Sequence, residues 1–586
     1  MRYPKSPWRD RGGRMLAAAL AIVIAGACAP RSTTAEATDG ASEFEPVIST
    51  SPLGQYLAGR HAERTKDISS AADFLSVALA ADPDNPALLL ETYLLLVSEG
   101  RIPEAVPLAE QLVELDPNSP HAWLTLAVEA AHRGDYAAAG EYVSQLPVDG
   151  VNRVLVPLIS GWTALETEGI EAAAEHVGFL SGLEGAEPLR QLHLGLMNEV
   201  VGENAQAAEI YEALAASSDL LSLREVQIVA NFRQRQGDGA GARALYDAFV
   251  ENTRSTLPLE PAYAALDEGK SVEPLIGSTA DGLAETFFDV AFLLQRQQAR
   301  DTSLVLLRKA IYLKPDFPIA HILLADTLAA DNRSEAAIAA YRQVPETSGF
   351  SWQARLETAR TLDSIERTDE AIALLDDMIE ERPDRFDAAQ LLGNVYRGRE
   401  RFAEAAPIYD IAVERLGTPD ENDWPLFYFR AIALERTQQW DRAEADFLKA
   451  LELYPEQPYV MNYLAYSWIE QGEHYDEALE MLIRAVELRP EDGFIIDSLG
   501  WVYYRLGDFE NAVEYLERAV ELTPTDPTIN DHLGDAYWQV GRQAEARFQW
   551  RRALSFGPEA ELISAIEGKL KSGLATDSSA DGTTGG

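Results

Sequence analysis

Residues 499–524 read LGWVYYRLGDFENAVEYLERAVELTP, and the spacing of this stretch recurs along the chain. Its recurring positions hold Leu499, Gly500, Tyr503, Gly507, Ala512, Leu516, Ala519 and Pro524. The same offsets 34 residues later hold Leu533, Gly534, Tyr537, Gly541, Ala546, Trp550, Ala553 and Pro558. With one extra residue near Glu473, the preceding unit holds Leu464, Ala465, Trp468, Gly472, Ala478, Leu482, Ala485 and Pro490. Small residues where two helices cross, and a proline that closes the second, predict a repeated helix hairpin.

This pattern resembles the tetratricopeptide repeat (TPR), and 14 candidate units can be placed. They start at Pro52, Pro86, Pro120, Val154, Pro188, Leu223, Ala284, Pro318, Trp352, Phe386, Trp424, Pro458, Gly493 and Pro527. One hairpin cannot bury its apolar face alone, so neighbouring units stack. We therefore expect an all-α solenoid, a right-handed superhelix of about 11 to 14 repeats in two segments, 52–256 and 284–558.

Residues 257–283 interrupt the spacing and contain three prolines and three glycines. This composition predicts a linker or insertion between the two segments, either a hinge or a plain insertion. We expect a capping helix at 559–570 and a disordered tail at 571–586. Residues 28–51, rich in Ala, Ser and Thr, are predicted to be a flexible tether.

The chain is strongly acidic, with 95 Asp and Glu against 49 Lys and Arg and a net charge of −46. The first 27 residues carry +4, so the remaining residues carry −50. A polyanion of this size repels nucleic acid and anionic lipid, so we expect no nucleic-acid partner. The acidic excess is typical of a solvated surface.

The N-terminus has the order of a targeting segment. A basic stretch ends at Arg14, an apolar run covers 15–25, and small residues precede Cys28, the only cysteine. This order resembles the lipobox of bacterial lipoproteins, which implies cleavage of residues 1–27, a lipid on Cys28 and membrane attachment. Ala29, where an inner-membrane signal usually has aspartate, favours an outer-membrane lipoprotein facing the periplasm. An ordinary signal peptide and an uncleaved anchor are the alternatives.

No catalytic motif stands out. The eight histidines are scattered, no second cysteine is available for a thiolate metal site, and neither a Gly-x-Ser-x-Gly elbow nor a Walker loop is present. The stretch GDGAGAR (237–243) lacks a third glycine at the spacing of a dinucleotide loop and the strand that would precede it, and it falls at a turn of the repeat. We therefore predict no catalytic residue, no metal and no cofactor.

Aromatic residues instead cluster on the first helices of the later repeats. In the repeats that this chain resembles, such positions line a concave groove, whereas Tyr503 is at a core position. Exposed aromatic clusters usually mark recognition surfaces. We predict a protein-binding groove containing Tyr428, Tyr459, Tyr466, Phe494, Trp501, Tyr504 and Trp538. Alternatively, neighbouring turns or the C-terminal helix cover these rings. A carboxylate clamp of the Lys–Asn kind is not expected, because Asn394 is accompanied by Gln390.

Residues 497–519 and 529–554, together with the lipobox and the two-part array, resemble TPR lipoproteins that act as adaptors of periplasmic carboxyl-terminal-processing proteases. The resemblance implies a non-enzymatic scaffold that brings a protease to its substrates, often cell-wall hydrolases. A lipoprotein of envelope assembly or polysaccharide export is a second interpretation. A cell-wall glycan hydrolase is the third, and it would need a carboxylate pocket that a solenoid rarely supplies.

Overall fold

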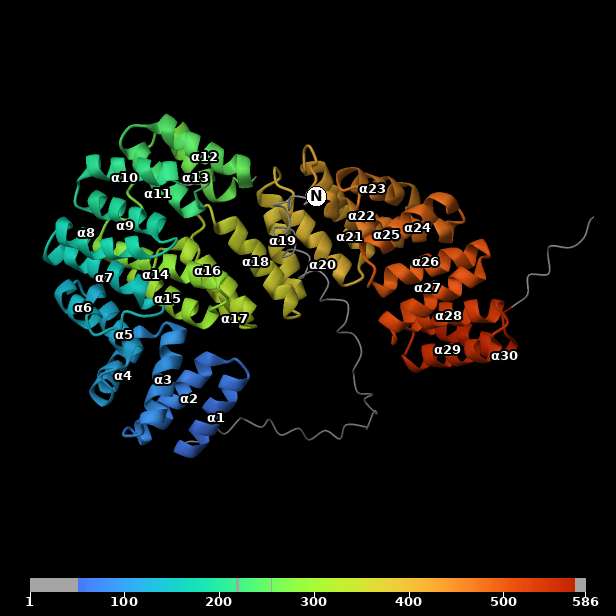
Figure 1. Cartoon of the computed structure of the whole chain (residues 1–586), viewed down its shortest axis with the longest axis horizontal. Coiled ribbons are helices and arrows are strands. Elements are labelled where there is room, and N and C mark those ends of the chain that lie inside the picture. Colours follow the sequence, from blue (N-terminus) through green and yellow to red (C-terminus); the bar gives the residue numbers. More distant parts are fainter. Residues whose placement is uncertain (1–50, 218–220, 254–255, 575–586) are drawn as a thin grey trace, which may run out of the picture.

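A computed structural model describes residues 51–217, 221–253 and 256–574. The predicted signal peptide, Cys28, nearly all of the tether and most of the tail lie outside these residues. The described residues form helices and no strand, so the all-α TPR solenoid is confirmed. Figure 1 shows the helices following one another as pairs from α1 to α30.

The helices form three groups along the chain. The N-terminal array is α1 (Pro52–Arg64), α2 (Ile68–Ala81), α3 (Pro86–Glu99), α4 (Ile102–Leu115), α5 (Pro120–His132), α6 (Tyr136–Val143), α7 (Asn152–Thr167), α8 (Ile170–Gly178), η1 (Phe179–Gly182), α9 (Glu187–Val200), α10 (Asn204–Ser217), α11 (Leu223–Arg235) and α12 (Gly239–Thr253). After η2 (Leu257–Leu259) and α13 (Glu260–Asp267), the central helices are α14 (Thr279–Arg296), α15 (Arg300–Leu313), α16 (Pro318–Ala330) and α17 (Ser334–Tyr341). The C-terminal array is α18 (Ser351–Ser364), α19 (Thr368–Glu381), α20 (Asp387–Gly398), α21 (Phe402–Arg415), α22 (Trp424–Arg436), α23 (Trp440–Leu453), α24 (Pro458–Gln471), α25 (Tyr475–Leu488), α26 (Gly493–Leu506), α27 (Phe509–Leu522), α28 (Pro527–Gln539) and α29 (Gln543–Ser555), followed by α30 (Ala560–Ser572).

The hairpin of α26 and α27 shows why the repeated residues fold in this way. Gly507 ends α26 in the left-handed region at φ 81°, which glycine adopts without steric cost. Asp508 then caps α27, because its side chain accepts a hydrogen bond from the backbone N–H of Asn511 at 3.3 Å. At the crossing, a Cβ on Gly500 would lie 2.7 Å from Cγ of Leu516, so the two helices approach closely only without a side chain there.

Nine of the 14 expected first helices begin at the residue that the spacing indicates. The largest difference is at α14, which begins at Thr279 rather than Ala284. Ser278 caps this helix by accepting a hydrogen bond from the N–H of Asp281 at 3.1 Å. The stretch 257–283 thus contains η2, α13 and the first turn of α14. Its Glu260 also pairs with Arg382 at 3.2 Å, so this stretch contacts the C-terminal array.

The central helices pack inside the curve of the N-terminal array. Helix α14 contacts α7 and α9, and α15 contacts α3 and α5 (Figure 1). The residues of α14 that face this array recur every three or four positions: Thr279, Gly282, Glu285 and Asp289. Thr279 donates to Glu166 at 2.6 Å, and Gly282 lies so close to Trp162 that a Cβ would stand 2.3 Å from the indole ring. The inner face of the N-terminal array is therefore filled by the chain itself.

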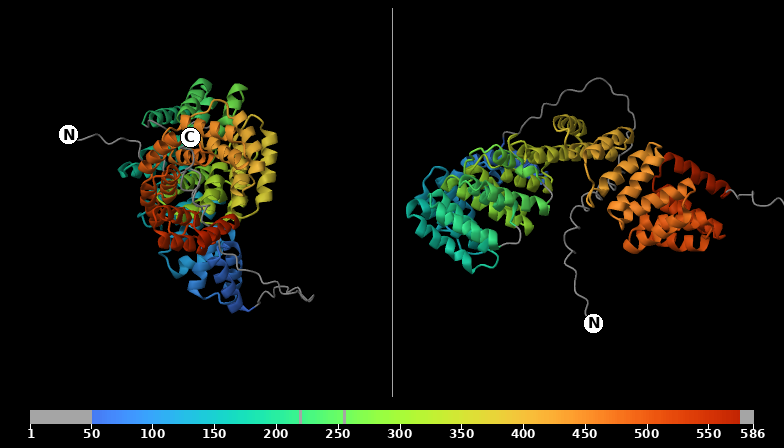
Figure 2. Two further views of the ribbon diagram at one scale, coloured as in Figure 1. Left: turned by 90° about the vertical axis from the view of Figure 1, so that its right-hand side faces the viewer. Right: turned by 90° about the horizontal axis from the view of Figure 1, so that it is seen from above.

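The boundary between the hydrophobic clusters agrees with this packing and does not lie at the interruption of the repeat spacing. One cluster joins residues of 124–249 with residues of 259–354, and a second runs from 338 to 566. A smaller cluster covers 62–126. The division between the two large cores thus lies close to α17 and α18, beyond the linker at 257–283. Seen from above, two thick bodies are joined by helices around α18 to α20 (Figure 2).

Candidate functional site: the inner face of the C-terminal array

The first helix of each hairpin in the C-terminal array lies on the inner side of the curve. Helices α18, α20, α22, α24, α26 and α28 carry this inner face, and most neighbours among them contact each other directly. The second helices of successive hairpins make no comparable contact within the described residues. First helices are therefore closer together, as expected on the shorter side of a curved solenoid. All seven predicted groove aromatics are on α22, α24, α26 or α28.

Trp501 is half-buried and has partners within the chain. Its ring stacks on Tyr504 at 4.7 Å between centroids and on His532 at 4.0 Å. Its indole N–H donates to Glu470 of the preceding repeat at 2.8 Å, and Arg505 donates to the same carboxylate oxygen at 3.0 Å. The structure thus brings Trp501 and Tyr504 together, as predicted for two groove residues, but internal rings and a carboxylate already contact them.

His532 was not predicted as a site residue, yet it is central to this cluster. Its Nδ1 lies 3.0 Å from Asp497 of α26, and both side chains are buried. Burial by itself lowers the pKa of His532, but Asp497, with Asp531 and Asp535, outweighs burial and raises the pKa. A protonated imidazole stacked on Trp501 adds a cation–π contact. The signal in the sequence was weak, because a single histidine on a helix is usually structural.

A second aromatic cluster surrounds Tyr428 on α22. Its ring lies 6.2 Å from Tyr463 in an edge-on arrangement, and burial raises the pKa of Tyr428 to about 12. The hydroxyl of Tyr463 donates to Glu435 at 3.1 Å. Beside this cluster, the guanidinium of Arg397 stands 4.1 Å from the ring centroid of Phe429. Tyr463, Phe429 and Arg397 were not among the predicted site residues.

The other predicted groove tyrosines are half-buried, and one phenylalanine is exposed. Tyr459 lies under the guanidinium of Arg489 at 5.6 Å, and burial raises the pKa of Tyr466. Phe494, at the start of α26, is 55% exposed. It is the most accessible apolar group among the seven predicted aromatics and presents a full ring to solvent.

Trp538 is covered by the end of α30 and the residue that follows it. A Cβ on Gly573, directly after α30, would lie 2.1 Å from the Trp538 ring. Lys569 of α30 holds the helix in place through ion pairs of 2.7 Å to both Asp531 and Asp535. Burial lowers the pKa of Lys569, but these two carboxylates outweigh it and raise the pKa. For this residue the structure agrees with the alternative interpretation, in which the C-terminal helix covers the aromatic ring.

The inner face carries no arrangement of metal ligands. Within the described residues, no group of three or more His, Cys, Asp or Glu is placed to hold a metal ion. Asn394, the asparagine at a clamp position, accepts a hydrogen bond from the hydroxyl of Tyr409 at 2.8 Å. Among the described helices, none is long and apolar enough to cross a membrane.

Models of known families match the chain in ranges that contain these helix pairs. Models of the tetratricopeptide repeat match residues 96–154, 356–421 and 428–493, and a TPR repeat model matches 500–541. The chain is a tetratricopeptide repeat protein. The matched ranges of this TPR protein include α20, α24 and α28, and therefore much of the inner face of the C-terminal array.

Solved structures similar to this TPR protein are distant in sequence. The Cut9–Hcn1 hetero-tetramer of APC/C is 14% identical, and the match covers 90% of this chain and 98% of that chain with a TM-score of 0.36. Yeast Tom70 is 15% identical, with coverages of 88% and 95% and a TM-score of 0.30. MamA from Desulfovibrio magneticus RS-1 is 21% identical, with coverages of 29% and 92% and a TM-score of 0.26. No curated protein matches the chain.

Proposed function

We propose that this TPR protein is a non-enzymatic scaffold that binds a protein partner along the inner face of the C-terminal array. One observation carries the proposal. The inner face of the N-terminal array is filled by α14 and α15, whereas no helix fills that of the C-terminal array within the described residues. Solenoids of this kind use a concave surface for recognition. Among the described residues, the C-terminal array is covered on this surface only at α28, where α30 contacts it.

The chemistry of the inner face favours a segment that is apolar and basic. Phe494 offers an exposed ring, and Glu470 offers an exposed carboxylate one repeat away. The net charge of −46 attracts positively charged partners and accelerates their encounter. An aromatic contact supported by complementary charge is a common basis of affinity at such surfaces.

The test compares two exposed phenylalanines on opposite sides of the array. Phe494 is on the inner helix α26 and is 55% exposed, whereas Phe548 is on the outer helix α29 and is 57% exposed. Partners are identified by crosslinking in envelopes, affinity purification and mass spectrometry. We expect Phe494→Ala to reduce their capture at least several-fold and Phe548→Ala to leave it unchanged. Equal capture by both variants would refute the inner-face assignment.

We also propose that the scaffold is an outer-membrane lipoprotein anchored through Cys28 and facing the periplasm. The basic stretch, the short apolar run and the small residues before a single cysteine support this proposal. A Cys28→Ser variant should lose incorporation of a fatty-acid analogue and move from the membrane fraction to the soluble fraction. Membrane attachment without any incorporated lipid would instead indicate an uncleaved anchor.

The finer proposal is that the scaffold brings a periplasmic carboxyl-terminal-processing protease to cell-wall hydrolase substrates. The resemblance of residues 497–519 and 529–554 to such adaptors supports it. Binding two partners on one surface raises their effective concentration. The protease should co-purify with the scaffold, and recovery of export or assembly proteins alone would favour the second interpretation. A clear band in zymography of the purified protein on cell-wall material would contradict a non-enzymatic role.

A further inference from the structure

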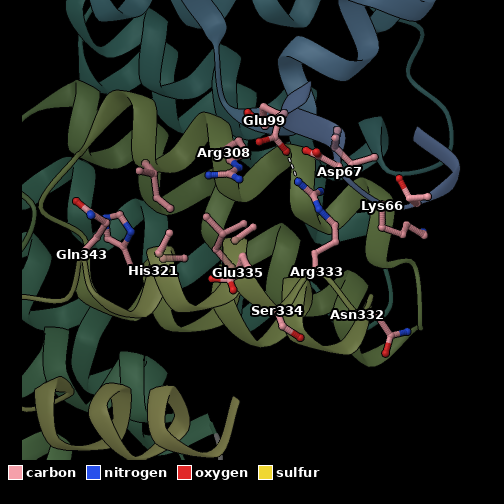
Figure 3. A pocket seen from close by; sticks show the side chains of 18 residues that line it. Lys66, Asp67, Glu99, Arg308, His321, Asn332, Arg333, Ser334, Glu335 and Gln343 are labelled. Carbon is pink, nitrogen blue, oxygen red and sulfur yellow. Dashed lines mark hydrogen bonds and ion pairs between the residues drawn. The ribbon is translucent and has the colours of Figure 1, made fainter. Parts of the chain in front are cut away.

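A cavity of about 680 Å³ lies where the N-terminal array meets the central helices. The turn between α1 and α2 and the end of α3 form one wall, and α15, α16 and α17 form the other (Figure 3). Its apolar lining includes Ile68, Ile311 and Leu324. The volume is within the usual range for small-molecule sites. This cavity is separate from the inner face of the C-terminal array.

Most charged groups that line the cavity have partners. Arg333 pairs with Glu99, and Lys66 pairs with Asp331 at 3.0 Å. Glu335 pairs with Arg367 at 2.8 Å. The remaining acid, Asp67, caps α2 by accepting a hydrogen bond from a backbone N–H at 3.1 Å. The three ion pairs neutralise one another, so Asp67 at the start of α2 and one cation remain.

That cation is Arg308 on α15. Its Nε donates to the carbonyl of Ser98 at 3.2 Å, and its two terminal nitrogens have no hydrogen-bond or ion-pair partner among the described residues. Burial lowers the pKa of Arg308, and the neighbouring Arg333 lowers it further, against the opposing effect of Glu99. An arginine remains charged under these conditions. A bound anion would therefore offset both the cost of burying the Arg308 charge and its repulsion from Arg333.

Two further polar groups in the cavity wall lack partners. Nε of Arg333 and Nδ1 of His321 are buried and make no hydrogen bond within the described residues, and the two side chains belong to residues that are 7% and 6% exposed. The other ring nitrogen of His321 lies 2.9 Å from the carbonyl of Pro315. Unsatisfied buried groups are rare in proteins and call for an explanation. Both belong to residues that line the cavity together with Arg308.

We propose that this cavity binds a small carboxylate with an apolar body, with the carboxylate on Arg308. A guanidinium holds a carboxylate through two parallel N–H···O bonds, and the terminal nitrogens of Arg308 are available for this. The apolar body packs against Ile68, Ile311 and Leu324. The carboxylate belongs either to a free metabolite or to the C-terminal residue of a polypeptide.

The test is calorimetric titration of the full chain with matched probes. N-acetyl-leucine carries the carboxylate, and N-acetyl-leucinamide has the same body without the charge. We expect the acid to bind at least about tenfold more tightly than the amide, because the charged contact is lost. An acetylated tetrapeptide ending in leucine distinguishes the two sources. Tighter binding than N-acetyl-leucine indicates a chain terminus, and weaker binding indicates a free metabolite.

Variants then locate the site. Arg308→Met keeps most of the volume and removes the charge, and it should abolish the preference for the acid. Arg484→Met, at an exposed ion pair on α25, is the matched control and should bind like the wild type. Ala339→Phe, from an exposed position on the cavity wall, should block the acid whether or not the arginine variant folds. The proposal would be overturned if the acid did not bind up to millimolar concentration or if acid and amide bound equally. Unchanged binding by both cavity variants would overturn it as well. Loss of partner capture by Phe494→Ala remains a separate readout, because that residue is on the inner face.

Discussion

Arg224 of α11 and Glu285 of α14 form a two-point ion pair, with both N–O distances at 2.7 Å. Glu285 is fully buried, and the two residues are 61 positions apart in the sequence. Burial by itself lowers the pKa of Arg224, but Glu285 outweighs it and raises the pKa. The pair fixes the register of α14 inside the N-terminal array, because a shift by one helical position would leave both charges buried and unpaired.

Glu285→Ala should destabilise the N-terminal array strongly. The variant leaves the Arg224 charge buried without a partner, and such losses cost about 3–5 kcal/mol. Glu381→Ala removes an exposed partner of Arg355, a pair at 2.6 Å, and is expected to cost about 1 kcal/mol or less. Urea unfolding followed by circular dichroism measures both free energies of unfolding. A cost for Glu285→Ala no larger than that of the control would contradict the role of this pair.

Lys309→Met should stabilise the packing of α15 on α5. Lys309 is 1% exposed and donates to Thr125 at 2.7 Å, and burial lowers its pKa to about 7. The unfolded chain binds this proton up to a pH of about 10, so the wild-type free energy of unfolding rises with pH between about 7 and 10. In the variant this rise should be smaller, and stability at pH 7 should increase by on the order of 1 kcal/mol. Thermal unfolding at several pH values checks both effects, and an unchanged pH slope would contradict the assignment.

The cluster of Trp501, His532 and Asp497 should make the C-terminal array sensitive to pH. The folded pKa of His532 is raised, so the protonated form stabilises the fold. Its contribution is fully present below a pH of about 6.5 and is lost as pH rises through the folded pKa. His532→Gln should remove this loss of stability at higher pH. Urea unfolding followed by tryptophan fluorescence at several pH values measures it. His474→Gln, at an exposed histidine on the turn before α25, is the control and should keep the wild-type profile.

Lys569→Met should loosen α30 and expose Trp538. Without the ammonium group, Asp531 and Asp535 face each other with no cation between them. Burial, followed by repulsion from Asp531, already raises the pKa of Asp535 to about 6. The loss of stability should therefore be larger at pH 8, where the carboxylate is charged, than at pH 5. A red shift of tryptophan emission at pH 8 is the expected signal, and Lys571→Met, at an exposed residue two positions later, should not produce it.

Most of the helix pairs could be predicted, because their signals are local. Pro458, Gly493 and Pro527 begin helices at the expected residues, since a proline or a capped turn sets the start of a helix within a few residues. The start of α14 was missed by five residues, because its cap at Ser278 has no counterpart in the repeat spacing. The candidate groove was located on the inner helices through residue offsets. The degree of exposure was not predictable, since it depends on neighbours in other repeats.

Trp501 and Trp538 illustrate that limit. Both were predicted to line the groove, yet His532 and Tyr504 stack on the first, and the end of α30 covers the second. Arg308 is the opposite case, a residue that the sequence did not indicate and that the structure places in a candidate site. Nothing in its sequence surroundings distinguishes it from other helix-surface arginines, and only where three separate segments enclose it does it lack an ion-pair partner among the described residues.

The sequence by itself determined the repeat, the all-helical fold and the order of the helix pairs, because these depend on contacts between residues within one or two repeats. Only the tertiary structure decided which inner face is filled by the central helices. The contacts of α14 with α11 and α7 join residues 61 and 113 positions apart, as Glu285 to Arg224 and Thr279 to Glu166 show. Such contacts depend on how far the superhelix has turned, and small rotations at each repeat add up to that angle.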